Sequence, residues 1–310
     1  MFHPAPAQGR FKGCSVHGAG GCGYVPETRY PAAPYCRSVR PGGRGPYELG
    51  DGEEIVPAPA HPWEAPLFVV CAVANVLLLG LGAHLLAVLT GTWQAPVLAL
   101  AAVPAGCWLV RGLRYARHRA ESVKISPTQF PEAYRVVATL SAAMGVRTPE
   151  AYVRVDGGRA DAGAHGLRRY LVLSGELFDD DGRVGDPDAL AFTVAHQLGH
   201  VVAGHTGFWR RLAVLGAEPV PLLGAALARC SEYTADNHAY AHFPEGAHTV
   251  RVHAGGVRLY PRVNMGEMAD RARTDRGCTL LLYHLLSRRP GNVRRMAALR
   301  DRGRRGRVFL

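Results

Sequence analysis

Charged residues are missing from a long stretch of the sequence, since residues 65–110 contain no Asp, Glu, Lys or Arg. Lysine is scarce throughout: Lys12 and Lys124 are the only two, so 34 of the 36 basic residues are arginines. Because arginine is preferred over lysine throughout the sequence, we do not take the presence of an arginine by itself as evidence for a functional site. The net charge of +11 does not indicate a nucleic-acid partner, and we expect none, because residues 288–307 hold nine Arg against one Asp and supply most of that charge.

Closely paired cysteines are also absent. Seven cysteines occur, an odd number, and none forms a CxxC pair, so we expect no disulfide scaffold. Cys14, His17, Cys22 and Cys36 offer zinc-ligand chemistry, but they lack the close spacing that structural zinc sites normally need. We treat this group only as an alternative metal site.

Residues 1–64 lack any hydrophobic period and contain 11 Gly and 10 Pro. Such a segment cannot bury enough apolar surface to offset the entropy lost on ordering. We predict a disordered, Gly/Pro-rich tail over 1–64.

The charge-free stretch predicts a transmembrane hairpin over residues 65–115. Leu67–Leu89 is long enough as a helix to cross a hydrocarbon core of ~30 Å, and Ala95–Val110 is a second, shorter apolar segment. The alternative is a buried hairpin of a soluble fold, which would normally show polar residues at helical period. The arginines at 111–119 follow the second segment, so the positive-inside rule predicts an integral protein of the cell membrane whose following domain faces the cytoplasm.

Beyond the hairpin the sequence predicts a mostly helical α+β domain. Pro131–Met144 has apolar residues at helical spacing and should end at Gly145. Ala151–Val155 and Tyr170–Ser174 are short apolar runs that indicate a small sheet. Asp186 followed by proline is typical of a helix N-cap and first turn.

Two histidines in the helix after Asp186 carry the first chemical signal. His196 and His200 are four residues apart, so they share one helical face within reach of a single ion. The spacing alone is weak evidence, because His238 and His242 repeat it.

A third ligand is suggested in a second helix, for which Pro221 is a possible start. Glu232 and Asp236 would share one face of that helix. Glu232 would complete a His/His/Glu zinc site with one open position, and Asp236 would orient a ligating histidine. The alternative is that both are solvated helix carboxylates.

These motifs carry a family resemblance. VAHQLGHVVAGH at 194–205 followed by SEYTAD at 231–236 resembles the HtpX and CAAX prenyl protease 1 family of gluzincin membrane zinc metalloendopeptidases. The resemblance covers about residues 66–305. It implies a zincin-like (gluzincin) domain over 124–305, one Zn²⁺ per chain on two histidines and a glutamate, and polypeptide substrates or clients that are membrane-associated or misfolded.

Three departures from the family pattern stand out. The family's extra hairpin between the two motifs is absent, although Leu212–Ala228 is apolar enough to lie on a membrane face. The loop before the strand at Leu171 reads Arg159-Ala160-Asp161, where many relatives have Asn-Ala. Gln197 occupies the position of the HExxH glutamate.

The third departure bears on activity. The family's glutamate takes a proton from the attacking water and later delivers it to the leaving amine, whereas a carboxamide cannot accept that proton at neutral pH. His205, Glu218 and His238 are the substitutes that sequence proximity offers. We therefore expect an attenuated peptidase or, alternatively, an inactive zinc-binding pseudopeptidase with a binding or regulatory role. A third class, an arginine-tailed binder of nucleic acid or anionic lipid, rests on 288–307.

Overall fold

The computed structural model describes residues 59–310 except 156–159, 166–167, 180, 302–304 and 310. Most of the predicted tail, and with it Cys14, His17, Cys22 and Cys36, lies outside the described residues. The end of that prediction is wrong, because His61 and Glu64 are buried. The backbone N–H of His61 donates to Thr234 Oγ1 over 2.9 Å, which fixes this segment against a helix of the domain.

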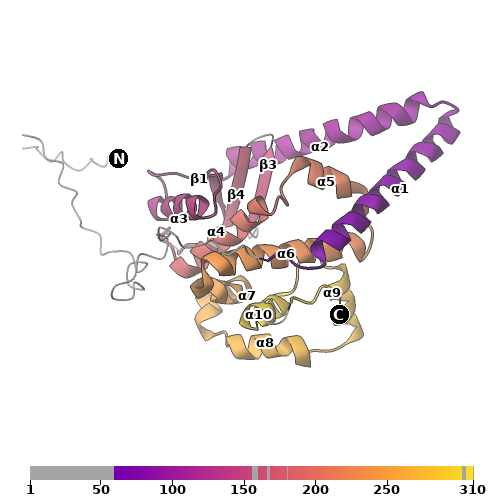
Figure 1. Ribbon diagram of the computed structural model, residues 1–310. Helices are drawn as coiled ribbons and strands as arrows, with labels where there is room; N and C mark the ends of the chain where they lie inside the picture. The colour runs from indigo at the N-terminus through magenta and orange to yellow at the C-terminus, as the bar shows by residue number, and fades with distance from the viewer. Residues whose placement is uncertain (1–58, 156–159, 166–167, 180, 302–304, 310) are drawn as a thin grey trace, which may run out of the picture.

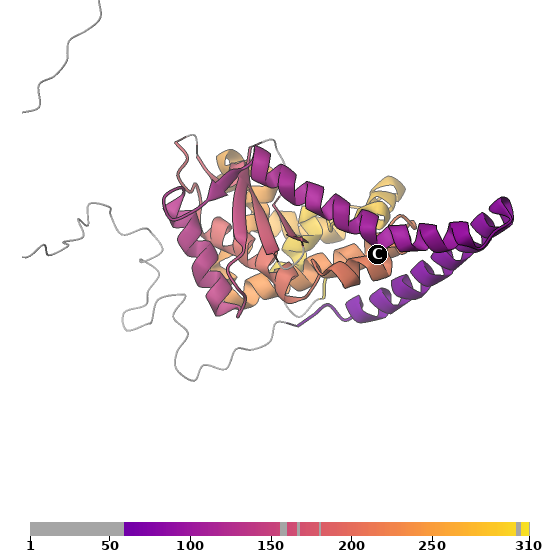
Figure 2. The same cartoon turned by 90° about the horizontal axis from the view of Figure 1, so that it is seen from above.

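Two long helices form the hairpin, α1 (Glu64–Thr90) and α2 (Gln94–Glu121), which project together away from the rest of the chain (Figures 1 and 2). Gly91 closes α1 with a left-handed backbone, φ 67°. Both predicted helices are present, but α2 does not end at Val110 and continues through the arginine cluster.

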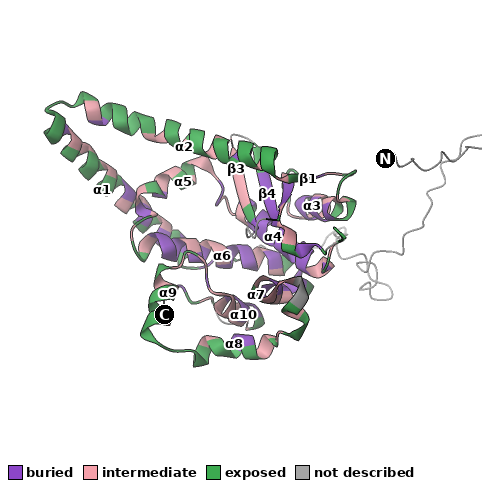
Figure 3. Ribbon diagram, turned by 180° about the vertical axis from the view of Figure 1, so that it is seen from behind, coloured by how far each residue is buried: buried purple, intermediate pink, exposed green. Residues whose placement is uncertain are grey.

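Most residues of the hairpin are exposed (Figure 3). The exposed apolar side chains include Leu77, Leu81, Leu89 and Leu98. Both helices are long and apolar enough to cross a membrane. Exposed apolar surface of this extent marks an interaction with a bilayer or another protein. The alternative of a soluble fold with a buried hairpin does not fit this exposure.

A small mixed sheet lies beside α2. Its strands are β1 (Val123–Ile125), β2 (Glu150–Arg154), β3 (Asp161–His165) and β4 (Arg168–Ser174), in the order β1-β2-β4-β3. The central pair β2 and β4 is parallel, and the outer pairs are antiparallel. The prediction of a small sheet is confirmed, and β3 forms the edge beside the end of α2.

Helices fill the remainder of the domain: α3 (Pro131–Ala143), α4 (Pro187–Val202), α5 (Phe208–Val214), α6 (Leu223–His242), α7 (Thr249–Leu259), α8 (Met265–Thr274), α9 (Cys278–Leu286) and α10 (Asn292–Arg300). Short 3₁₀ turns lie at Gly175–Leu177, Leu215–Ala217, Pro244–His248 and Tyr260–Arg262. The predicted start of a helix at Pro221 is two residues early. The apolar run 212–228 is divided among α5, a 3₁₀ turn and α6, so it does not form one continuous helix.

Helix α4 is the centre of the core. Leu190, Val194 and Leu198 are fully buried in a cluster that includes Leu171 and Leu173 of the sheet. The helix begins as the sequence predicts: Asp186 Oδ1 accepts a 3.0 Å hydrogen bond from the N–H of Ala189, which caps its first turn.

Glycines matter at two points of this domain. Gly145 follows α3 with φ +65°, as predicted for a helix stop. At Gly199, an added Cβ would lie 2.8 Å from His238 Cβ. Gly199 therefore permits the close approach of α4 and α6 on which the candidate site depends.

Candidate metal centre

The metal-ligating side chains predicted from sequence meet between α4 and α6. His196 and His200 project from one face of α4, and Glu232 projects from α6 toward them. His196 Nε2 lies 3.6 Å from Glu232 Oε2, and His200 Nε2 lies 3.7 Å from Glu232 Oε1. In the part of the chain that the structure describes, this is the group of His, Cys, Asp and Glu side chains that could hold a metal ion. The alternative pair His238 and His242 is not part of it.

The donor set and its spacing fit a zinc ion. Ligand atoms ~2.0–2.1 Å from a tetrahedral ion lie ~3.3 Å apart, and the two distances from a histidine nitrogen to a Glu232 oxygen need only a small contraction to reach that value. All three ligand atoms lie within 4.8 Å of one another. A second observation is an orphaned polar atom: Gln197 is buried, and its Oε1 has no hydrogen-bond partner within the described residues. Such an atom needs a partner from outside the described residues.

The first histidine is held from behind by a carboxylate. Asp236 Oδ1 lies 2.8 Å from His196 Nδ1, so the imidazole donates there and turns Nε2 toward Glu232. Arg295 of α10 donates from Nε to Asp236 Oδ2 over 2.9 Å. Both Asp236 and Arg295 are buried, and their charges compensate each other. Asp236 therefore takes the orienting place that the sequence predicts, and Arg295 supports it.

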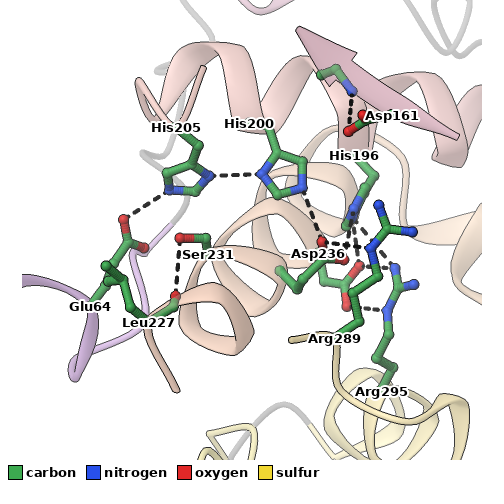
Figure 4. Close-up of polar contacts among 12 residues, drawn as sticks. Glu64, Asp161, His196, His200, His205, Leu227, Ser231, Asp236, Arg289 and Arg295 are labelled. Atoms are coloured by element: carbon green, nitrogen blue, oxygen red, sulfur yellow. Dashed lines mark hydrogen bonds and ion pairs between the residues drawn. The ribbon is translucent and has the colours of Figure 1, made fainter. Parts of the chain in front are cut away.

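The second histidine is held by a longer chain of contacts, shown in Figure 4. His200 Nδ1 lies 2.8 Å from His205 Nδ1, and His205 Nε2 lies 2.8 Å from Glu64 Oε1. The Glu64 carboxylate can only accept, so His205 donates to it from Nε2, and a His205 ring that carries one proton then accepts from His200 at Nδ1. The carboxylate of Glu64 also accepts hydrogen bonds from the hydroxyl of Thr234 and the guanidinium of Arg210. The first residue of α1 is thus linked to a candidate ligand on α4.

The electrostatics of the three candidate ligands differ. For His196, burial opposes protonation, but the charge of Asp236 and its hydrogen bond raise the pKa above the ordinary value. Burial lowers the pKa of His200 well below its ordinary value, which keeps the imidazole neutral. Burial opposes ionisation of Glu232, but its hydrogen bond with His196 and the nearby charges hold its pKa well below the usual range. For Asp236, burial is likewise outweighed by Arg295 and His196, and the pKa lies far below normal. The site offers a neutral histidine and an ionised carboxylate at neutral pH.

A cavity of about 270 Å³ opens beside the ligands. His200 and Glu232 line it, together with Asp161 and Ala162 of the edge strand β3. Arg289 also lines it, with Nε 3.4 Å from Glu232 Oε1. A small molecule or an extended chain entering this cavity would meet the metal ligands and the free edge of β3 together.

The proposed substitute bases have other partners. Both ring nitrogens of His205 are engaged by His200 and Glu64. Glu218 pairs with Arg211 at 3.0 Å and Arg288 at 3.2 Å. His238 packs against Gly199. In the loop 159–161, which differs from the family pattern, Arg159 lies outside the described residues. Asp161 begins β3, and its Oδ1 accepts a hydrogen bond from the N–H of Ala162.

Sequence reasoning missed Glu64, Arg289 and Arg295. Glu64 carried a weak signal, because it is the last acidic residue before the charge-free stretch. The two arginines carried none in a chain so rich in this residue. Comparisons with protein-family models, with curated proteins and with solved structures find no match to this chain.

Proposed function

We propose that the protein is a membrane-anchored zinc metalloendopeptidase-like protein that acts on membrane-associated or misfolded polypeptides from the cytoplasmic side of the cell membrane. The observation that carries the proposal is the convergence of His196, His200 and Glu232 from two helices beside a cavity. The motif resemblance to the HtpX and CAAX prenyl protease 1 family supports a gluzincin fold and the choice of zinc.

His196, His200 and Glu232 would hold the ion. A zinc ion held by three protein ligands supplies Lewis-acid polarisation of a carbonyl and a nucleophile at neutral pH. The chain itself supplies the orientation, because Asp236 and His205 fix the two imidazoles through their Nδ1 atoms.

The free edge of β3 supports an extended polypeptide as the substrate. Among the described residues of the sheet, β3 pairs only with β4, and Asp161 and Ala162 at its start line the cavity. An extended peptide can add to such an edge through main-chain hydrogen bonds, with little demand on its sequence. That mode of binding fits clients chosen for being unfolded.

Gln197 favours an attenuated enzyme. Its carboxamide can hold a water molecule by a hydrogen bond but cannot take its proton at neutral pH. A general base contributes ~10²–10⁴-fold to such reactions. The same residue supports the second candidate function, an inactive zinc-binding pseudopeptidase that binds polypeptide without cleaving it.

Gln197→Glu in the full-length protein tests both. We expect casein hydrolysis to rise by ~10²-fold or more, because a proton acceptor is restored on an otherwise complete site, and to disappear with a zinc chelator. The matched control is Gln197→Glu combined with His196→Ala, which restores the base but removes a ligand. A wild-type rate equal to that of the Glu variant would refute the attenuation. A zinc-loaded Glu variant that remains inert would refute the peptidase and leave the pseudopeptidase.

A further inference from the structure

A second cavity, separate from the metal ligands, lies where α2 leaves the charge-free stretch. Its volume is about 600 Å³, within the range of ~300–1,000 Å³ typical of small-molecule sites. It lies between α2, the edge strand β3 and α5, where α2 passes above the sheet in Figure 1. Buried Tyr170 and Val172 of the sheet form part of its wall.

The lining of this cavity is strongly basic. Five guanidinium groups from three separate elements line it, against the carboxylates of Asp161 and Glu218 in the lining and that of Glu121, which pairs with Arg117 over 2.7 Å. The five belong to Arg111, Arg114, Arg117, Arg154 and Arg211. A concave site with this excess of positive charge favours an anionic ligand.

Several of these groups are already held in place. Arg111 donates to the carbonyl oxygen of Thr206 over 2.7 Å, and its guanidinium lies 5.9 Å from the centre of the Phe208 ring. Arg211 is fixed by its ion pair with Glu218. His118 also lines the cavity, and its buried Nδ1 has no hydrogen-bond partner within the described residues.

The opposite end of the cavity is apolar. Gly106, Cys107 and Val110 line it, within about one and a half turns before Arg111 on the same helix. Residues 111–117 span ~9 Å of helix at 1.5 Å per residue, close to the headgroup layer of ~5–8 Å on each side of a bilayer. The exposed side chains of Leu109 and Leu113 flank the same turns. The cavity is thus cationic at headgroup depth and apolar at acyl-chain depth.

We infer that this cavity binds the phosphate headgroup of an anionic glycerophospholipid, with its acyl chains along the apolar turns of α2. Basic pockets between membrane helices recognise such headgroups. The two cavities share Asp161, Thr206, Arg211 and Glu218, so the bound lipid would lie next to the candidate metal centre. From the proposed function the inference takes only the membrane hairpin, and it needs neither metal nor hydrolysis.

The test uses the full-length protein in a neutral detergent and calorimetric titration with short-chain soluble lipids. We expect dihexanoyl phosphatidylglycerol to bind at least tenfold more tightly than dihexanoyl phosphatidylcholine, and more tightly than glycerol 3-phosphate. Arg114→Gln with Arg154→Gln should weaken phosphatidylglycerol binding about tenfold or more, since two cationic groups are lost. The same two positions changed to Lys should retain most of it.

The matched control is Arg119→Gln with Arg169→Gln, which removes equal charge from α2 and β4 outside the cavity. It should change the affinity less than about twofold. Equal affinity for the two lipids, or an equal loss in the control, would overturn the site. Glycerol 3-phosphate binding as tightly as phosphatidylglycerol would overturn the lipid and identify a free-phosphate site. The lipid titration does not depend on casein cleavage, so the lipid site can be confirmed even if the protein has no peptidase activity.

Discussion

The contact chain from Glu64 through His205 to His200 predicts that a residue at the start of the apolar hairpin contributes to the metal affinity of the candidate site. The decisive change is His205→Ala, which removes the acceptor of the His200 Nδ1–H bond at 2.8 Å. His200 then loses the contact that turns Nε2 toward Glu232. His205→Gln retains an acceptor oxygen and should restore part of the affinity.

The expected magnitude follows from the kind of contact. Loss of a group that orients a ligating histidine typically weakens metal binding 10–100-fold, about 1.4–2.7 kcal/mol. Glu64→Gln should have a smaller effect in the same direction. Its carboxylate accepts from both His205 and Thr234, and a carboxamide, with one acceptor oxygen, cannot fully serve both donors.

Zinc affinity is measured by competition with a chromophoric chelator in the detergent-solubilised full chain. Because Glu64 acts on the metal through His205, the double variant Glu64→Gln with His205→Ala should bind zinc no more weakly than His205→Ala alone. The thermal stability of the double variant should nevertheless be lower than that of His205→Ala. Glu218→Gln is the matched control, a carboxylate of the same cavity that pairs with arginines. Additive losses of zinc affinity, or unchanged affinity in His205→Ala, would refute the reasoning.

Three further outcomes are expected. Elemental analysis should find about one zinc per chain, lost in His196→Ala and in Glu232→Ala but not in His242→Ala, and full zinc in both ligand variants would place the ion elsewhere. The protein should resist carbonate extraction from membranes, and recovery in the soluble fraction without detergent would contradict the hairpin. The hydrogen bond between His248 and Asp186, at 2.9 Å, raises the pKa of His248 above 6.5, so the contribution of this pair to stability is complete below pH 6.5 and is lost as pH rises through the folded pKa. His248→Gln should therefore reduce the change of Tm between pH 6 and 8. A pH dependence of Tm equal to that of the wild type would exclude a contribution from the pair.

Local sequence patterns were sufficient to predict those parts of the candidate site and fold that depend on a single helix. A helix of any origin brings His196 and His200 to one face, and an aspartate before a proline caps α4 whatever packs around it. The pairing with Glu232 was harder to predict, because it depends on how closely α4 approaches α6. Gly199 permits that approach, but a glycine within a helical pattern does not itself reveal which helix lies against it.

Elements stabilised by distant partners escaped prediction. The strand β3 reads Asp-Ala-Gly-Ala-His, without a single β-branched residue, and is held by antiparallel pairing with β4. Arg295 was counted among the basic residues of a charged C-terminal end. It is buried instead, because its charge is balanced by Asp236 from another helix.

The apolar run at the start of α1 also gave no sign of which of its residues pack on the domain. Leu67, Cys71 and Asn75 recur every four residues and are all buried, so one face of the helix packs on the domain. Asn75 appeared in the sequence only as a polar interruption of an apolar run, yet its Oδ1 accepts from the N–H of Gly216 over 2.6 Å and its Nδ2 donates to Leu212. A polar residue in an apolar helix usually faces protein rather than lipid. With Glu64 on the same helix, it joins the hairpin to the metal centre, so displacement of α1 would reach His200 through His205.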